Sequence, residues 1–247
     1  MAADGKIKGM LFDMGSTLIE FENHSWEELD GRSISAAYEF LKKSGHPLPE
    51  FPSFEKGFRS VLAEYWSSTN ETLEEKPLAH LLELGLTRAG FEKNGLNMEA
   101  LGRIFYQPIR SQISEYDDAV DVLNWLQGKN LALAVVSNSI FPSEYHLEDL
   151  RAFGLAPFFQ TTLFSSEIGR RKPHPEIFRR ALSALSLRPE EVIFVGDRMR
   201  EDVLGPQNLG IRAVLKHHPK RDYSLGAKPF ATVKSLSGLL PVVEKHI

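Results

Sequence analysis

Residues 10–20 read MLFDMGSTLIE, a short apolar run with a carboxylate at its end. The run stops at Asp13, and a glycine, two hydroxyl residues and further apolar residues follow it. A short apolar run of this kind is typical of a buried β-strand, and the residue at its end is free to carry chemistry. We therefore interpret Asp13 as a candidate nucleophile or metal ligand at the end of a strand.

Further candidate strands follow about a hundred residues later, at 131–136, 161–166, 192–195 and 212–216. Two of these runs are continuously apolar and rich in valine and isoleucine, as expected for strands that are covered on both faces. Amphipathic segments with helical spacing lie at 117–128, 174–185 and 201–209. This alternation predicts an α/β fold, a parallel sheet with helices on both faces. Ligands of such sheets bind at the carboxyl ends of the strands.

The interval 20–113 has a different pattern, with several helical periods and no convincing strand. A helix that starts with a serine cap and ends near Gly45 is the clearest of them. We predict two domains, an α/β core formed by 1–19 and 114–247 and a helical insertion formed by 20–113. Near the end of the chain we expect a surface connection over 216–230 and a last helix over 233–246.

The composition excludes several classes of protein. The 247 residues are 42% hydrophobic and carry a net charge of −4, which gives no general attraction to nucleic acid or anionic membranes. No apolar run approaches the roughly 18 residues of a membrane span, and no signal peptide is expected from the first residues. Cysteine is absent, which excludes disulfides and thiolate metal sites. We expect a cytoplasmic protein without nucleic-acid or membrane partners, and its oligomeric state stays open.

Polar residues follow four of the predicted strands. They are Asp13, then Ser137 with Asn138, then Lys172 with Pro173, and finally Asp197, with Asp202 five residues further on. Each feature alone is common in loops, and an aspartate at the start of a helix is often only a cap. Their order and their positions together are the signal.

The motifs LFDMGST (11–17), AVVSN (134–138), RRKPHPEIF (170–178) and FVGDRMRED (194–202) resemble, in order, the four motifs of the haloacid dehalogenase superfamily of hydrolases. The helical insertion lies where one branch of that superfamily places a cap domain. The resemblance covers nearly the whole predicted core. It implies a Rossmann-like core with a small all-helical cap, and a magnesium-dependent hydrolase, most simply a phosphatase of a small phosphorylated metabolite.

The resemblance also implies a role for each matched residue. Asp13 would be the nucleophile that forms an aspartyl-phosphate, and Lys172 would supply a positive charge beside it. Hydroxyl and amide donors for the substrate would come from Thr17, Ser137 and Asn138. The ligands of Mg²⁺ would be Asp13, the backbone carbonyl of Gly15, Asp197 and Asp202. Asp202 has the further options of holding Lys172 and of capping a helix.

One position departs from the family pattern. Phosphatases of this family carry a second aspartate two residues after the nucleophile, which protonates the leaving group and activates water, a contribution of about 10²–10⁴-fold. Here Gly15 occupies that position and transfers no proton. A leaving group that departs without protonation, such as that of an acyl phosphate or anhydride, is one explanation. Another is a substitute acid among Glu20, Glu22 and His24.

Two further alternatives concern the type of reaction. Dehalogenases and phosphonatases of this superfamily also lack an aspartate at that position. Against a dehalogenase, which needs no metal, the Asp197–Asp202 pair suits a cation. Against a phosphonatase, which uses a reactive lysine of the cap, the lysines of the insertion lie in charged contexts. The last alternative is a catalytically weak or inactive protein that binds a phosphorylated ligand or a partner.

Two groups of basic residues flank these motifs or follow them. The arginines either attract an anion or are solvated; they are Arg170, Arg171, Arg198 and Arg200. The pair His217–His218 is interpreted as a surface feature.

Overall fold

The computed structural model describes residues 6–91 and 95–247. The chain divides into two compact units. One contains the residues up to Glu20 together with Ser114–Ile247, and the other is Phe21–Ile113. Within the described residues, the helices are too short or too polar to cross a lipid bilayer.

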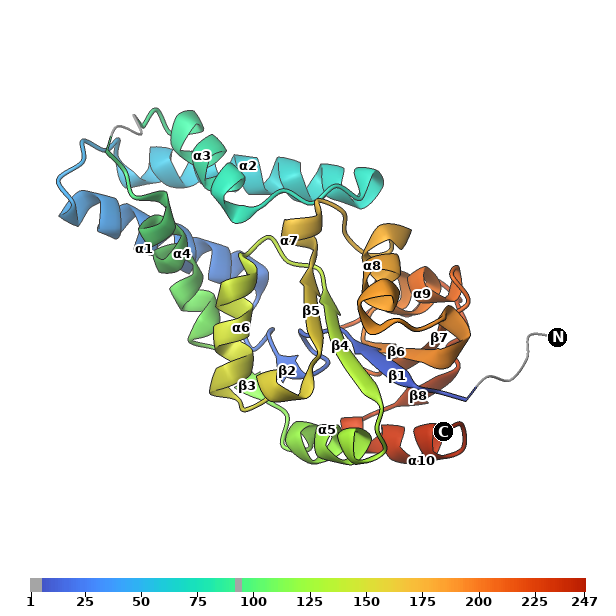
Figure 1. Cartoon of the computed structure of the whole chain (residues 1–247). Coiled ribbons are helices and arrows are strands. Elements are labelled where there is room, and N and C mark those ends of the chain that lie inside the picture. The colour runs from blue at the N-terminus through green and yellow to red at the C-terminus, as the bar shows by residue number, and fades with distance from the viewer. Residues whose placement is uncertain (1–5, 92–94) are drawn as a thin grey trace. The chain divides into compact units, whose positions relative to one another are not determined.

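The first unit is built on a six-stranded sheet whose strands all run parallel, in the order β5–β4–β1–β6–β7–β8 (Figure 1). The strands are β1 (Gly9–Phe12), β4 (Ala132–Ser137), β5 (Thr161–Phe164), β6 (Val192–Gly196), β7 (Arg212–Lys216) and β8 (Ala231–Val233). From β1 the chain builds outward on one side through β4 and β5. It then returns to the other side of β1 with β6, so the strand order reverses between β1 and β6.

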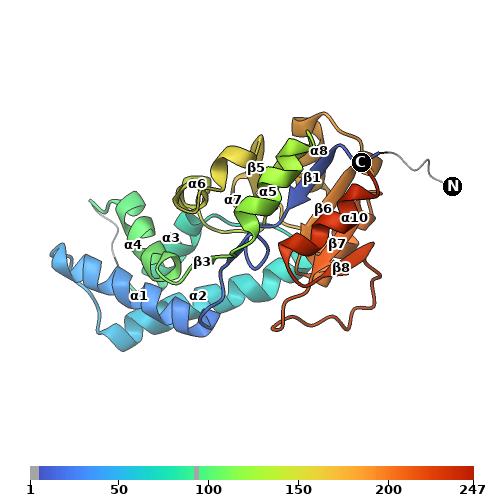
Figure 2. The same cartoon turned by 90° about the horizontal axis from the view of Figure 1, so that it is seen from below.

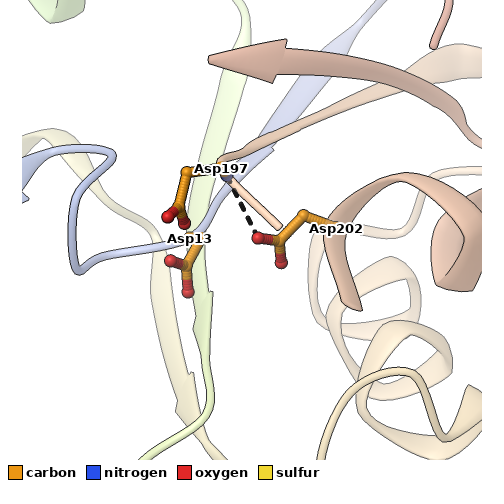
Figure 3. A group of neighbouring side chains, drawn as sticks. All are labelled: Asp13, Asp197 and Asp202. Carbon is orange, nitrogen blue, oxygen red and sulfur yellow. Dashed lines mark hydrogen bonds between the residues drawn. The ribbon is translucent and has the colours of Figure 1, made fainter. Parts of the chain in front are cut away.

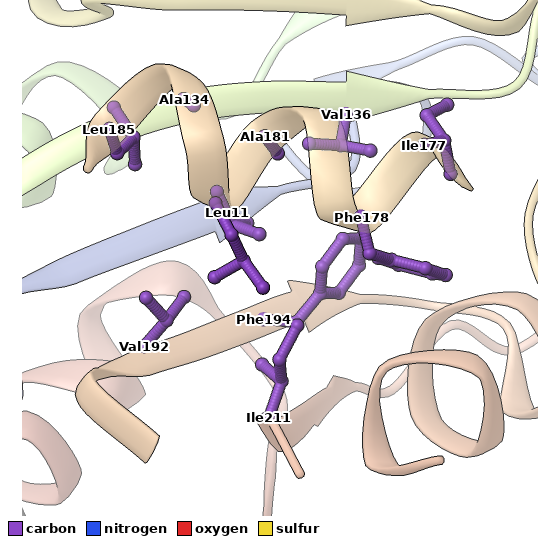
Figure 4. Close-up of a cluster of buried hydrophobic side chains, with 11 residues drawn as sticks. Leu11, Ala134, Val136, Ile177, Phe178, Ala181, Leu185, Val192, Phe194 and Ile211 are labelled. Atoms are coloured by element: carbon purple, nitrogen blue, oxygen red, sulfur yellow. The ribbon is translucent and has the colours of Figure 1, made fainter. Parts of the chain in front are cut away.

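The sheet is covered on both faces. Leu11 and Phe194 point toward α8 (Pro175–Leu185), whose residues Phe178 and Ala181 pack against them in a cluster of buried side chains (Figure 4). Figures 1 and 2 show α5 (Ala119–Gly128) and α10 (Leu240–Glu244) on the opposite face. The prediction of a parallel α/β sheet with helices on both faces is confirmed.

Shorter elements complete this unit. A two-residue strand, β2 (Ile19–Glu20), pairs antiparallel with β3 (Ser114–Glu115), at the two points where the chain passes between the units. The helices α6, α7 and α9 are Ser143–Ala152, Ser165–Ile168 and Gly205–Gln207, and a π-helix, Met199–Leu204, precedes α9. The predicted helix over 201–209 is thus a π-helix that starts two residues earlier and continues as a short α-helix.

Two predictions for the end of the chain are wrong. The last helix was expected to begin at 233, but residues 231–233 form strand β8, because their backbone pairs with β7, and α10 covers only Leu240–Glu244. The segment 216–230 is not a simple surface connection. Lys216 and His218 are buried in it, since β7 ends beside β6 and directs the following residues toward the interior.

The second unit is helical, with α1 (Trp26–Lys43), α2 (Phe51–Thr72), α3 (Leu78–Arg88) and α4 (Met98–Arg110). The first helix begins at a serine cap, as the sequence indicates, because the Ser25 side chain accepts a hydrogen bond from the backbone N–H of Glu28. Apolar side chains such as Phe54, Phe58 and Leu82 are buried within the unit. These helices are consistent with a cap, and that interpretation stays a prediction.

Candidate active site

Two aspartates meet at the point where the strand order of the sheet reverses. Asp13 directly follows β1 and Asp197 directly follows β6, and these strands are neighbours with Phe12 opposite Val195. The backbone N–H of Asp13 donates to the carbonyl of Val195 at 2.9 Å. Carboxylate oxygens of Asp13, Asp197 and Asp202 all lie within 4.8 Å of one another (Figure 3). This is the edge of the sheet at which ligands of such folds bind.

A buried lysine joins two of these carboxylates. Lys172 is 2% exposed, and its Nζ donates to Oδ1 of Asp13 and to Oδ1 of Asp202, each at 2.7 Å. Burial disfavours the charged ammonium, but the two carboxylates outweigh it, so the pKa of Lys172 is raised. The side chain therefore remains a cation at neutral pH.

Asn138 fixes the position of Lys172. Its amide Nδ2 donates to the backbone carbonyl of Lys172 at 3.0 Å, and its Oδ1 accepts from the backbone N–H of Lys172 at 2.7 Å. This reciprocal pair joins the end of β4 to the loop after α7. Both polar groups of the Asn138 side chain thus bind protein, while its predicted contact with a substrate stays a prediction.

One of the two predicted hydroxyl donors, Ser137, is bound to the nucleophile candidate. Ser137 Oγ donates to Asp13 Oδ1 at 2.9 Å, so this oxygen accepts from both Ser137 and Lys172. Thr17 is fully buried, and its Oγ1 has no hydrogen-bond partner among the described residues. A buried hydroxyl without a partner is costly in a folded protein unless a ligand or water satisfies it.

Asp202 is anchored on both of its oxygens. Oδ1 binds Lys172, while Oδ2 accepts from the backbone N–H groups of Asp197 at 3.1 Å and Arg198 at 2.9 Å. A Cβ added at Gly196 would overlap the carboxyl group of Asp202, so only glycine permits this close approach. The contacts show Asp202 holding Lys172, one of the roles that the sequence left open, and binding the backbone of the loop after β6 rather than capping a helix.

The two carboxylate oxygens of Asp197 differ in their hydrogen bonding. Its side chain is fully buried, and Oδ2 accepts a hydrogen bond from Nε of Arg221. Oδ1 is buried and has no partner among the described residues. Burial and the charge of Asp13 raise the pKa of Asp197, and Arg221 opposes this shift. An unsatisfied carboxylate oxygen beside a second carboxylate suits a hard divalent cation, so the donors present fit magnesium.

The structure adds residues that the sequence analysis did not single out. Arg221 Nη2 donates to Ser16 Oγ at 3.2 Å, and Lys216 Nζ donates to the Ser16 carbonyl at 3.0 Å. Ser16 has a left-handed backbone (φ 55°), an uncommon conformation for serine, between Gly15 and Thr17. The Lys216 ammonium also lies 3.5 Å from the centre of the Tyr116 ring. Lys216 at the end of β7 and Arg221 in the segment that follows therefore hold the loop after β1.

The carboxylate of Glu20 is contacted by three side chains of this region. Its carboxylate accepts from Ser16 Oγ at 3.2 Å and from Tyr116 Oη at 2.8 Å, and it lies 3.1 Å from His218 Nε2. The backbone N–H of Lys220 donates to His218 Nδ1, so a neutral His218 carries its proton on Nε2 and donates it to Glu20. His218 is buried, and its interpretation as a surface residue is wrong because Glu20 draws it inward.

The other two substitute acids lie in the second unit. Glu22 accepts from the indole N–H of Trp26 at 3.3 Å, and His24 Nδ1 lies 3.2 Å from a carboxylate oxygen of Glu28. Both contacts are local to the start of α1. Their suggested role in catalysis stays a prediction.

The comparisons with known proteins identify the family. Residues 7–210 match the model of the haloacid dehalogenase-like hydrolases. The chain is 37% identical over 245 residues to a glyceraldehyde 3-phosphate phosphatase of Pyrococcus furiosus, covering 98% of this chain and 95% of that one. The chain belongs to the haloacid dehalogenase-like hydrolase family and is an enzyme, a hydrolase. The predicted superfamily and enzyme class are confirmed.

Two further matches are informative. A phosphoserine phosphatase of Thermus thermophilus is 39% identical over 99 residues, which is 40% of this chain and 39% of that protein. Among solved structures, a phosphatase of the same family from Thermococcus onnurineus superposes with a TM-score of 0.68 at 21% identity, covering 96% of this chain and 98% of that one. At that identity the superposition shows the shared fold alone.

Proposed function

We propose that this hydrolase is a magnesium-dependent phosphatase of a small phosphorylated metabolite, with Asp13 as the nucleophile. The observation that carries the proposal is the bridge from Asp13 through Lys172 to Asp202, with two contacts of 2.7 Å in a buried position at the carboxyl edge of the sheet. Relatives named as phosphatases support a phosphorylated substrate.

The contacts of Asp13 suggest how the attack is arranged. Ser137 and Lys172 both hold Oδ1, so we assign the attack to Oδ2. A bond forms between Oδ2 and phosphorus while the bond from phosphorus to the leaving oxygen breaks, and water later hydrolyses the aspartyl-phosphate. In this proposal Lys172 neutralises charge on the transferred group, and Thr17, whose buried hydroxyl has no partner among the described residues, would donate a hydrogen bond to it.

Magnesium would be held by Asp13, Asp197 and the backbone carbonyl of Gly15. The open Oδ1 of Asp197 supports this assignment, whereas both oxygens of Asp202 already bind Lys172 and backbone N–H groups. Asp202 would therefore act through Lys172 and the loop. A bound magnesium ion supplies positive charge against the phosphate oxygens.

The proton for the leaving group is the unusual part of this site. Gly15 has no acid, and both carboxylate oxygens of Glu20 are already engaged, one with Ser16 and the other with Tyr116 and His218. Glu20 is therefore held by these contacts rather than directed at a leaving group. We therefore propose that substrates whose leaving group departs without protonation, such as acyl phosphates or phosphoanhydrides, are hydrolysed faster than alkyl phosphates.

The test is phosphate release from a panel of alkyl phosphates, acyl phosphates and phosphoanhydrides, with magnesium and with a chelator. We expect release that requires magnesium and that Asp13→Asn abolishes, while circular dichroism shows that the variant is folded. Release that continues unchanged in Asp13→Asn would refute the proposed nucleophile. No turnover of any compound, together with no magnesium binding, would support a binding or inactive protein instead.

A further inference from the structure

Arg221 makes a contact that a simple carboxylate metal site does not require. Its guanidinium donates through Nε to Asp197 and through Nη2 to Ser16, and the side chain is 11% exposed. One arginine thereby contacts a proposed metal ligand and the residue next to Gly15, whose carbonyl is another proposed ligand. The planar fork of arginine suits such a two-sided contact.

The loop that carries Arg221 is built to present it. The backbone N–H of Arg221 donates to the carbonyl of His218 at 3.2 Å, and Tyr223 Oη accepts from the backbone N–H of His218 at 2.7 Å. His218 is in turn held by Glu20. These contacts fix the turn after β7 independently of Asp197, so Arg221 is placed by its own loop rather than by the carboxylate alone.

We propose that Arg221 is a resident counter-cation of the metal site, which shares the Asp197 carboxylate with a divalent cation and lowers the affinity for that cation. The inference rests on the proposed function, because it needs the metal site. Arg221 occupies Oδ2 of Asp197, while Oδ1 stays open beside Asp13. Arginine and metal therefore bind different oxygens of one carboxylate, and both can be present together.

The charges decide the direction of the effect. Lys172 pairs with Asp13 and Asp202, Arg221 pairs with Asp197, and Arg198 and Lys216 also act on Asp197 through their charges. Of these cations Arg221 is hydrogen-bonded to the Asp197 carboxylate, so its loss removes the positive charge in direct contact with that proposed ligand, and a divalent cation is repelled less. Loss of Arg221 also frees the Asp197 side chain to rotate, which opposes binding, but ordering one short side chain is a smaller effect than a full charge in a buried site. Binding should therefore tighten.

The experiment compares metal binding by the metal-free wild type, Arg221→Gln and Arg221→Lys, using calorimetric titration with MnCl₂ and MgCl₂ in buffer without phosphate. We expect Arg221→Gln to bind the cation about tenfold more tightly or better. Arg221→Lys keeps the charge and should stay within about threefold of the wild type. Arg212→Gln removes the same charge at the opposite end of β7, and it should leave the affinity unchanged.

A second readout separates this role from a purely structural one. Metal-free Arg221→Gln should melt below the wild type, because a buried carboxylate loses its partner. Added magnesium should then raise its melting temperature by more than it raises that of the wild type, because the tighter site stabilises the fold more. A variant that melts lower and gains no more from magnesium would show a structural role alone and would overturn the proposal.

The outcomes also separate this inference from the proposed function. If the wild type binds the cation, Asp197→Asn abolishes binding, and Arg221→Gln binds equally or more weakly, then the metal site stands and the role of Arg221 is refuted. If neither the wild type nor Arg221→Gln binds magnesium or manganese, both the metal site and the inference fail.

Discussion

Replacement of Lys172 by methionine should lower the free energy of unfolding by about 3–5 kcal/mol. Lys172 is 2% exposed and makes two ion pairs of 2.7 Å, to Asp13 and Asp202. Hydrogen bonds to charged groups contribute about 1.5–3 kcal/mol each, so two of them account for this range. Methionine keeps an unbranched apolar chain beside the Phe194 ring, so the loss reports mainly the missing cation.

The loss should also depend on pH. Without Lys172, burial raises the pKa of the Asp202 carboxyl without the opposing effect of the cation. A carboxyl with a raised pKa in the folded state costs stability at high pH, and that cost shrinks as pH falls and the group binds a proton. The stability gap between wild type and Lys172→Met should therefore be smaller at pH 5.5 than at pH 8.

Urea unfolding followed by circular dichroism measures both effects, with Lys8→Met as the matched control. Lys8 pairs with Glu191 at 2.6 Å, but its side chain is 60% exposed, so Lys8→Met should unfold at nearly the wild-type urea concentration. A Lys172→Met variant that unfolds at the same concentration as Lys8→Met would contradict the claim that Lys172 neutralises two buried carboxylates.

Three further changes test other parts of the account. Gly196→Ala should lower the free energy of unfolding by about 2 kcal/mol or more and weaken magnesium binding, because its Cβ would overlap the Asp202 carboxyl. Gly128→Ala is the control, since its Cβ meets no neighbouring atom and should leave stability unchanged. Equal urea midpoints for the two variants would refute this prediction. Burial raises the pKa of Asp30 to about 6, so the ionised carboxylate costs stability at high pH. Asp30→Asn should therefore raise the free energy of unfolding by about 1–2 kcal/mol at pH 8 and hardly at all near pH 4. The same gain at pH 8 and at pH 4 would refute this prediction. Burial lowers the pKa of His146 to about 3, so its ring resonances should not titrate between pH 5 and 8 by NMR, and a midpoint in that interval would contradict its buried, neutral state.

The sequence was sufficient for the parts of the fold that depend on local pattern. Continuous apolar runs predicted the central strands, because a strand covered on both faces needs apolar side chains on both. The position of Asp13 and Asp197 at strand ends followed from the same runs. Parallel pairing then places both residues at one edge of the sheet, next to each other, because β1 and β6 are neighbours.

Features set by the three-dimensional arrangement escaped the sequence analysis. The stretch 216–230 has the composition of an exposed loop, but Lys216 and His218 are buried and Arg221 is half-buried, which depends on β7 lying beside β6. The last predicted helix failed for a related reason. Strand β8 is stabilised by pairing with β7, a contact that the local sequence does not encode.

The central claim is that Asp13 attacks phosphorus and carries the phosphoryl group during turnover. The most direct measurement is acid quenching of the enzyme during hydrolysis of a ³²P-labelled acyl phosphate, followed by digestion and identification of the labelled peptide. We expect label on the peptide that contains Asp13, sensitive to hydroxylamine and absent in Asp13→Asn. Turnover of the compound without label on that peptide would contradict it.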